Sequence, residues 1–179
     1  MKKPKRSHVV FLAVLMLLAA AALWYVFPRT ADDLFPELDW AEAAVITANW
    51  SRYEANPEKP TALCVQYDGA VPDLPAGSEA GKAVLGTLRK MKLRRSLLDL
   101  ISGNVTHTHP TQPGDVKLYM EVKRDNGSLI LRMEFWFDRI FWKYPGENNL
   151  VCFTADQSTV TADLLAALQP LTAETRTER

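Results

Sequence analysis

The chain has 179 residues, 47% of them hydrophobic, with 21 basic and 21 acidic residues. This length suits one folded domain with a short appendage and is too small for two comfortable domains. Four basic residues and no acidic residue precede Phe27, which leaves 17 basic residues (21 minus those four) against 21 acidic ones. A mildly acidic remainder argues against a nucleic-acid binder held by phosphate contacts.

An uncharged segment without proline or glycine covers residues 9–27, VVFLAVLMLLAAAALWYVF. At 1.5 Å per residue, a helix of this length nearly spans the roughly 30 Å of bilayer hydrocarbon. Basic residues in 1–8 precede it, and Trp24 and Tyr25 stand where interfacial aromatic residues are common. We therefore expect a single-pass signal anchor in the cell membrane, with residues 1–8 cytoplasmic, the lipid bilayer around residues 9–27, and the rest extracytoplasmic.

A cleaved signal peptide, which would release a secreted form of the same domain, is the alternative. Residues 19–22 are four alanines, and signal peptidase requires small residues at its cleavage site. Cleavage there would leave an apolar mature terminus, LWYVFP, and the apolar run exceeds the roughly 7–15 residues of a typical signal peptide. The uncleaved anchor is therefore favoured.

The part after the anchor divides by composition into a linker, a domain and a tail. Residues 28–39 hold two prolines and four acidic residues, which is typical of a juxtamembrane linker. The folded domain is expected over residues 40–170. Residues 171–179 are polar, and we expect them to be a frayed C-terminal tail.

Alternating apolar and polar residues predict several strands in the domain. The clearest signal is Asn126-Gly127 between two alternating runs, which predicts a hairpin over residues 115–139. Further strands are predicted over 43–53, 61–67, 140–144 and 149–155.

Two helices are predicted, one on each side of the hairpin. Ser78 can cap a helix from about Glu79 to Met91, but residues 92–102 could be helix or strand. A second helix is predicted with Ser158 or Thr161 as its cap and with leucines at helical spacing. The sum is an α+β fold: an N-terminal transmembrane helix, then one domain with a mainly antiparallel sheet of about 4–6 strands and two helices packed on one face.

This layout resembles that of small uncharacterised bacterial domains exported behind a single N-terminal membrane anchor. The resemblance is architectural and covers the whole chain without a diagnostic motif. It implies an extracytoplasmic location and transfers no functional residue.

Two cysteines, Cys64 and Cys152, stand in strand-like runs. Outside the cytoplasm a disulfide between them is permitted and would stabilise the fold by roughly 3–5 kcal/mol. Two free buried thiols are the alternative, because free cysteine is among the most buried residue types.

His107 and His109 are two residues apart, so on a strand both imidazoles would point to the same side, as chelation requires. A metal site needs three or four ligands, and Asp99, Asp115 or a cysteine would have to complete this one. The neighbouring residues have the composition of a loop, so a solvated loop is favoured over a metal site.

A cluster of five basic residues is the densest charge feature after the N-terminus; it comprises Arg89, Lys90, Lys92, Arg94 and Arg95. It could bind an anionic envelope polymer, lipid headgroups or an acidic protein, although a solvated helix face is the commoner role of such a run. A second candidate surface is aromatic: Tyr119, Trp136 and Trp142 could form a binding platform on the polar side of the hairpin.

The sequence contains no G-x-S-x-G, H-E-x-x-H, C-x-x-C, P-loop or G-x-G-x-x-G motif. No cofactor is therefore expected, and no catalytic residue can be named. We expect a non-enzymatic binding or interaction module of the cell envelope, with a metal-binding domain using His107 and His109 as the alternative function.

Overall fold

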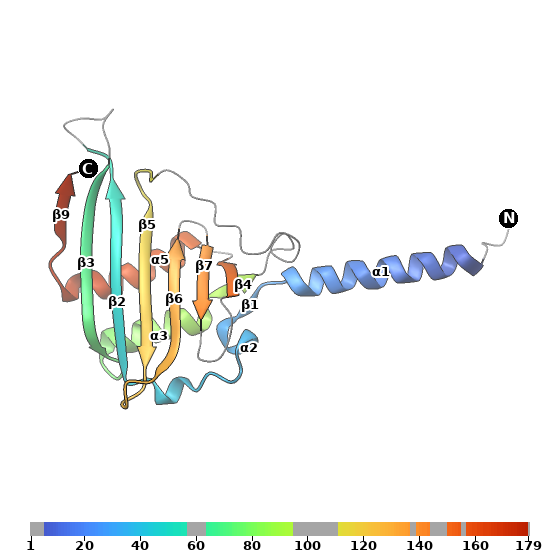
Figure 1. Ribbon diagram of the computed structural model, residues 1–179, viewed down its shortest axis with the longest axis horizontal. Helices are drawn as coiled ribbons and strands as arrows, with labels where there is room; N and C mark the ends of the chain where they lie inside the picture. Colours follow the sequence, from blue (N-terminus) through green and yellow to red (C-terminus); the bar gives the residue numbers. More distant parts are fainter. Residues whose placement is uncertain are drawn as a thin grey trace.

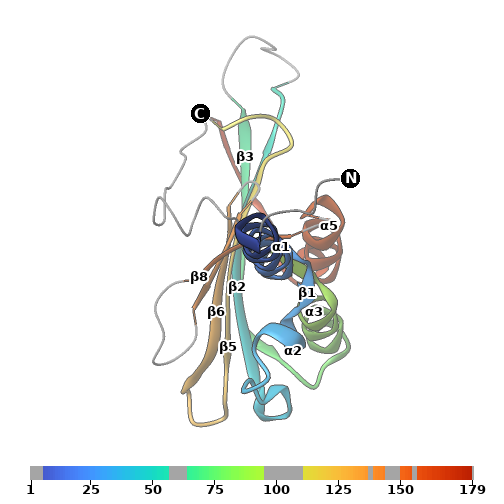
Figure 2. The same cartoon turned by 90° about the vertical axis from the view of Figure 1, so that its right-hand side faces the viewer.

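The structure, a computed structural model, describes residues 6–56, 64–94, 111–136, 139–143, 150–154 and 157–178. A long helix, α1 (Arg6–Val26), extends from the edge of a layered domain (Figure 1). In that domain helices lie on one face of an antiparallel sheet, as Figure 2 shows edge-on. The predicted α+β class is thus confirmed.

The sheet has nine strands, all paired antiparallel, in the order β1-β4-β8-β7-β6-β5-β2-β3-β9. Their bounds are β1 (Arg29–Thr30), β2 (Val45–Glu54), β3 (Val65–Pro75), β4 (Lys92–Arg94), β5 (Val116–Lys123), β6 (Leu129–Trp136), β7 (Arg139–Lys143), β8 (Leu150–Thr154) and β9 (Thr175–Glu178). The six strands of five or more residues overlap those that the sequence predicts, but β3 continues to Pro75, eight residues beyond the expected end at residue 67. The short β1, β4 and β9 extend the sheet beyond the expected four to six strands, because each adds to a strand edge supplied by a distant part of the chain.

The predicted hairpin is β5–β6. Gly127 adopts φ 77°, and its amide donates to the Arg124 carbonyl at 2.9 Å, while the Arg124 amide donates to the Ser128 carbonyl at 2.9 Å. Only glycine adopts such a φ without strain, so the Asn-Gly signal specified the turn correctly. In the register that follows, Leu118 faces Phe135 and Met120 faces Met133, which places these four side chains on the same side of the sheet.

The domain helices are short and lie on this apolar side. They are α2 (Ala31–Leu34), α3 (Glu79–Lys90) and α5 (Gln157–Leu168), with 3-10 turns η1 (Trp40–Glu42) and η2 (Gln169–Leu171). Ser78 caps α3 as predicted, its Oγ accepting from the Gly81 amide at 3.0 Å. The helix ends at Lys90, and 92–94 form β4; the remainder of the ambiguous segment 92–102 lies outside the described residues.

The core lies between the helices and the sheet. Phe135, Met133 and Leu131 from β6 are fully buried, as are Val84 and Leu88 from α3. Burying each such side chain contributes about 1.5–3 kcal/mol, so this layer supplies the main stabilisation of the domain.

The predicted linker 28–39 is instead part of the folded domain. Thr30 and Asp33 form a capping box at the start of α2, and the Thr30 hydroxyl donates to Asp33 Oδ2 at 2.7 Å. Ala31 and Phe35 are buried in the core cluster. The two prolines and four acidic residues suggest a linker. The apolar residues between them instead pack the segment into the core.

The predicted frayed tail 171–179 is likewise ordered over most of its length. Residues 175–178 form β9, which pairs with residues 65–68 of β3. Edge strands carry unpaired backbone groups, and the tail satisfies part of this edge.

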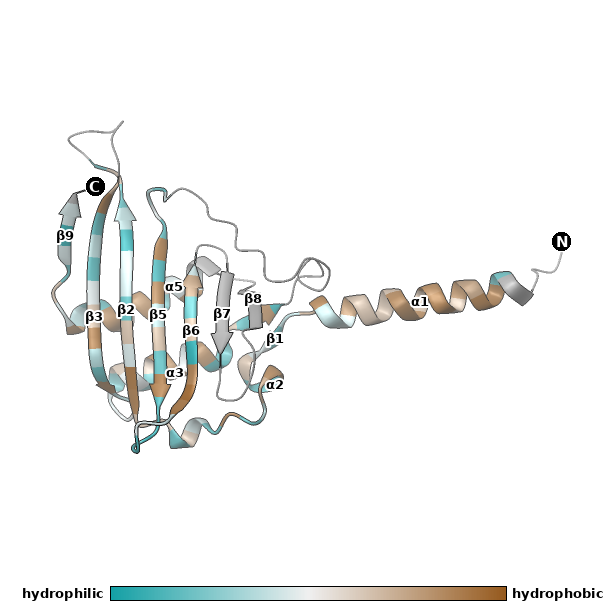
Figure 3. Cartoon of the chain, in the orientation of Figure 1, coloured by the Kyte–Doolittle hydropathy of each residue, from teal (hydrophilic) through white to brown (hydrophobic). Residues whose placement is uncertain are grey.

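Among the described residues, one helix is long and apolar enough, by length and composition, to cross a membrane: residues 8–26 of α1, within one residue of the expected 9–27. None of this segment is buried against the domain. Hydrophobic residues follow one another along most of its length (Figure 3).

Candidate functional site

The face of the sheet opposite the helices carries a polar and aromatic surface that no described helix covers (Figure 2). The two-residue period of the strands sends alternate side chains there. A hollow of about 670 Å³ lies on it, and its lining includes Asn49 and Ser51 from β2, Asp68 and Ala70 from β3, Lys117 and Tyr119 from β5, and Glu134 and Trp136 from β6. Thr172, Ala173 and Thr175 line the hollow next to β9. We refer to this hollow as the open-face site.

Lys117 of the open-face site stands between two aromatic rings, Trp136 of the site and Tyr53 farther along β2. Its Nζ lies 5.2 Å from the centre of the Trp136 ring and 5.5 Å from that of the Tyr53 ring. Both distances are within the roughly 6 Å at which a cation is attracted to an aromatic face. The ammonium group therefore interacts favourably with both rings at this end of the site.

The polar side chains at the other end are held by hydrogen bonds. Asp68 accepts from the Ser51 hydroxyl at 2.5 Å and from the Gln66 amide nitrogen at 2.7 Å. Asn49 and Glu134 are exposed. The site thus combines aromatic rings with hydrogen-bonding groups.

A charged cluster on the same face adjoins the site through Tyr119. Glu121 accepts from the Tyr119 hydroxyl and from Arg132 Nη2 at 2.6 Å, and it pairs with Lys123 Nζ at 2.7 Å. Burial acts to raise the pKa of Glu121, but the hydrogen bonds from Lys123, Tyr119 and Arg132 outweigh it and hold the pKa at about 2. Burial and the hydrogen bond to Glu121 raise the pKa of Tyr119 to about 12, so its phenol stays protonated at neutral pH.

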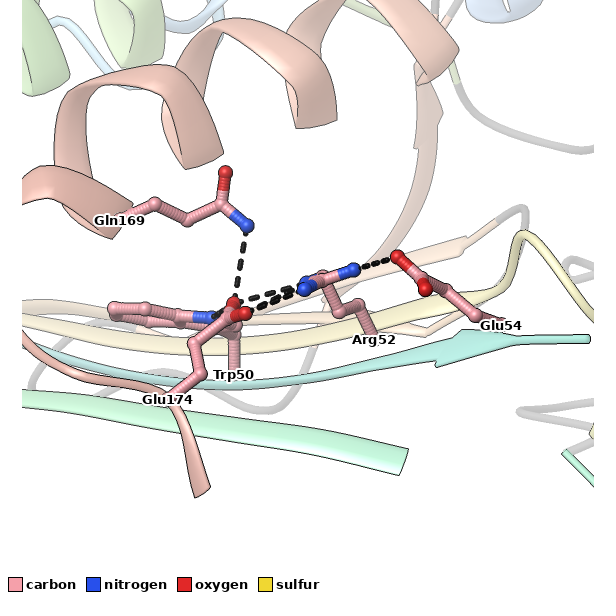
Figure 4. A network of polar contacts seen from close by, with 5 residues as sticks. All are labelled: Trp50, Arg52, Glu54, Gln169 and Glu174. Atoms are coloured by element: carbon pink, nitrogen blue, oxygen red, sulfur yellow. Dashed lines mark hydrogen bonds and ion pairs between the residues drawn. The ribbon is translucent and has the colours of Figure 1, made fainter. Parts of the chain in front are cut away.

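The C-terminal wall of the site is fixed by a network on the helix side of the sheet (Figure 4). Glu174, just before β9, accepts from the Trp50 indole at 2.8 Å, from Gln169 at 3.0 Å and from Arg52 Nη2 at 2.6 Å. The hydrogen bonds from Arg52, Trp50 and Gln169 lower the pKa of Glu174 to about 2 against the effect of its burial. Arg52 also pairs with Glu54.

The lack of a side chain at Gly69 leaves the space that the Trp50 indole occupies in this network. A Cβ at Gly69 would lie 2.2 Å from Cζ2 of Trp50, closer than real side chains approach. The indole therefore lies flat over β3, from where its N–H reaches Glu174. Neither the network nor the role of Gly69 was predicted, because Trp50 and Glu174 are 124 residues apart.

The cysteines are separated by the order of the strands. Cys64 is a free cysteine just before β3, and Cys152 lies in β8, five strand positions away. At about 4.8 Å between neighbouring strands this is roughly 24 Å, far beyond the reach of a disulfide. The predicted disulfide is wrong for this fold, and Cys64 is half-buried rather than buried.

The predicted metal ligands His107, His109 and Asp99 lie outside the described residues. Asp115 is described, and its carboxylate accepts from the backbone amide of Gln112 at 2.6 Å in a local turn. No group of three metal-binding side chains occurs within the described part of the chain.

The basic cluster is divided by the structure. Arg89 pairs with Asp32 at 2.9 Å, whereas Lys90, Lys92 and Arg94 are exposed, and Arg95 lies outside the described residues. Of the predicted aromatic platform, Tyr119 and Trp136 meet in the open-face site. Trp142 belongs to β7, and its side chain is not among those described.

Comparison of the chain with protein-family models, with curated proteins and with solved structures finds no match.

Proposed function

We propose that this chain is a single-pass membrane-anchored binding module of the cell envelope, with a cytoplasmic N-terminus and an extracytoplasmic domain. The observation that carries the proposal is α1: an apolar helix of which residues 8–26 bury nothing against the domain. In water such a surface would be unfavourable by about 25 cal/mol for each Å² exposed, so a bilayer is its natural environment. The basic residues before α1 support the orientation.

The open-face site is the ligand-binding surface in this proposal. Trp136 offers an amphipathic ring, and Asn49, Asp68 and Glu134 offer donors and acceptors within the same hollow. Such a combination suits a ligand with one flat apolar surface and polar groups at its edge. Among the described side chains lining the site there is neither histidine nor cysteine, and the proposed role is binding.

Alkaline carbonate extraction of cell membranes, followed by protease digestion of intact cells, tests the anchor. The proposal expects the chain to stay in the membrane pellet with residues 28–179 digested from outside, and mass spectrometry should find an intact N-terminus. Release by carbonate would contradict the anchor. A mature N-terminus near Leu23 would establish the cleaved, secreted form instead.

Saturation-transfer NMR with a panel of small polar fragments tests the open-face site on the full chain in nanodiscs. Fragments that bind the wild type should lose their signal with Trp136→Ala. Glu37→Ala is the matched control, because Glu37 is exposed and lies away from the site. Fragments that bind both variants equally would place the ligand elsewhere.

A further inference from the structure

The end of α1 and the basic residues of β4 lie at the same edge of the sheet. β1 begins three residues after Val26 and pairs with β4, with Arg29 opposite Leu93 and Thr30 opposite Lys92 (Figure 1). Three residues of extended chain cover at most about 10 Å, and neighbouring strands are about 5 Å apart. The backbone of β4 is therefore within roughly 15 Å of the end of α1.

This junction is braced by side-chain contacts. The Arg29 guanidinium lies 3.9 Å from the centre of the Trp24 ring, and its Nη2 donates to the Trp24 carbonyl at 2.9 Å. Leu93 is fully buried in the domain core. Direct contacts thus join the last turn of α1 to β1, and β1 to β4. These contacts restrict how far β4 can move from the membrane end of α1.

The acidic residues near this junction are already engaged. Asp33 closes the capping box with Thr30, and Asp32 pairs with Arg89. Lys90, Lys92 and Arg94 are exposed, and none of the three forms an ion pair with another described residue. We call these three residues the basic edge.

We propose that the basic edge binds anionic lipid headgroups of the bilayer that holds α1. The inference rests on the proposed anchoring by α1, and it adds a second, electrostatic contact that fixes how the domain lies on the membrane. A lysine or arginine side chain extends about 6 Å, and the electrostatic screening length in physiological salt is about 8 Å, so charges this near the anchor feel the headgroups. Each such charge strengthens attachment to an anionic surface roughly fivefold.

Headgroups fit this edge better than a soluble polymer does. The basic edge adjoins the strand that emerges from the anchor, so an anionic bilayer surface is within reach without a further binding partner.

Amine acetylation of the full chain in nanodiscs tests the proposal. One set of discs contains phosphatidylcholine alone, and the other contains one quarter phosphatidylglycerol. We expect initial acetylation rates of Lys90 and Lys92, read by mass spectrometry, to fall severalfold in the anionic discs. Lys82 is the internal control: it is exposed on α3, eight residues or about 12 Å before Lys90, and its rate should change little.

Three further arms make the outcome decisive. About 1 M salt should remove the difference between the discs, because the screening length falls to about 3 Å. Arg94→Gln should weaken the protection of Lys92, whereas Lys82→Gln should not. Protection by added soluble polyphosphate in phosphatidylcholine discs that equals or exceeds the protection in anionic discs would overturn the assignment to headgroups.

Equal rates at Lys90 and Lys92 in both discs, or an equal fall at Lys82, would also overturn the proposal. Failure of the anchor gives a different result, because the chain would then not enter phosphatidylcholine discs at all. The two failures are therefore distinguishable in the same preparation.

Discussion

Two glutamates with a pKa of about 2 lie on opposite faces of the sheet, and their partners come from different distances along the chain. Glu174, on the helix side, is held by Trp50 and Arg52, more than 120 residues earlier. Glu121, on the open side, is held by neighbours in its own hairpin, such as Arg132 eleven residues later.

The difference shows that an equal pKa does not imply an equal structural role. Glu174 joins the end of the chain to the second strand, so its loss should release β9 and one wall of the open-face site. Glu121 joins β5 to β6, which are already joined by a tight turn and seven register pairs. We expect the first contact to act on the whole fold and the second on one hairpin.

Acid should act on both glutamates at once, and this is the largest effect we expect. Each pKa is lowered from 4.5 to about 2 in the folded state, so the unfolded chain binds more protons at acidic pH. The stabilisation is fully present above pH 4.5 and is lost as the pH falls toward 2, by up to about 3 kcal/mol for Glu174 and by about 1 kcal/mol for Glu121, whose partners Arg132 and Lys123 are 41% and 33% exposed. Urea unfolding of the full chain in nanodiscs should therefore show a loss of several kcal/mol between pH 5 and pH 2.

The contribution of each face to this pH dependence can be measured with two variants, Glu174→Gln and Glu121→Gln. Each should remove a part of the slope of the free energy of unfolding against pH. A double variant that keeps the full wild-type slope would show that other carboxylates cause the acid sensitivity.

Glu174→Ala at neutral pH should cost about 2–3 kcal/mol, because it leaves the buried Trp50 indole without its acceptor and leaves the half-buried Arg52 with only Glu54 as a partner. Hydrogen exchange should quicken in residues 175–178 and in the paired residues 65–68. Glu37→Ala is the control for the loss of an exposed glutamate. Unchanged exchange in β9 would mean that strand pairing alone holds the C-terminal segment.

Gly69→Ala should cost about 2 kcal/mol, since a methyl group there overlaps the Trp50 ring and forces it to move. The added loss should shrink in a Glu174→Ala background, because the indole then has no hydrogen bond left to lose. Gly77→Ala is the matched control, as a Cβ at Gly77 would meet nothing within 4 Å. Strictly additive losses would contradict a shared network.

Glu121→Ala should have the smallest effect, about 1 kcal/mol. Arg132 is 41% exposed and Lys123 is 33% exposed, so water can replace part of what they lose. Exchange should quicken within β5 and β6 and stay unchanged in β9. A loss as large as that of Glu174→Ala would remove the distinction between the two faces.

Local signals account for the parts of the fold that the sequence predicts well. Gly127 specifies its turn through its own φ, and Ser78 caps α3 by accepting from the backbone amide three residues later. The alternation of β5 and β6 also placed Tyr119 and Trp136 on the open side. Each of these features depends on residues within about ten positions of one another, where local conformational propensity and hydrophobic pattern determine the structure.

The remainder depends on partners far along the chain. Residues 175–178, TRTE, show no apolar alternation, and they form a strand because β3 presents an unpaired edge to them. The pairing of β1 with β4 likewise joins residues more than 60 positions apart. Lys117 reaches the ring of Tyr53 only because β5 pairs with β2. No window of the sequence contains both members of any of these pairs.

The position of β9 has a consequence for synthesis. Pairing with β9 covers only residues 65–68 of β3, and the rest of that edge carries Pro72 and Pro75, which cannot donate to an added strand. Residues 65–68 lack this protection, and their partner leaves the ribosome more than one hundred residues later. Until then a neighbouring nascent chain can pair with the same four residues, so the interval before β9 docks is the time of greatest aggregation risk.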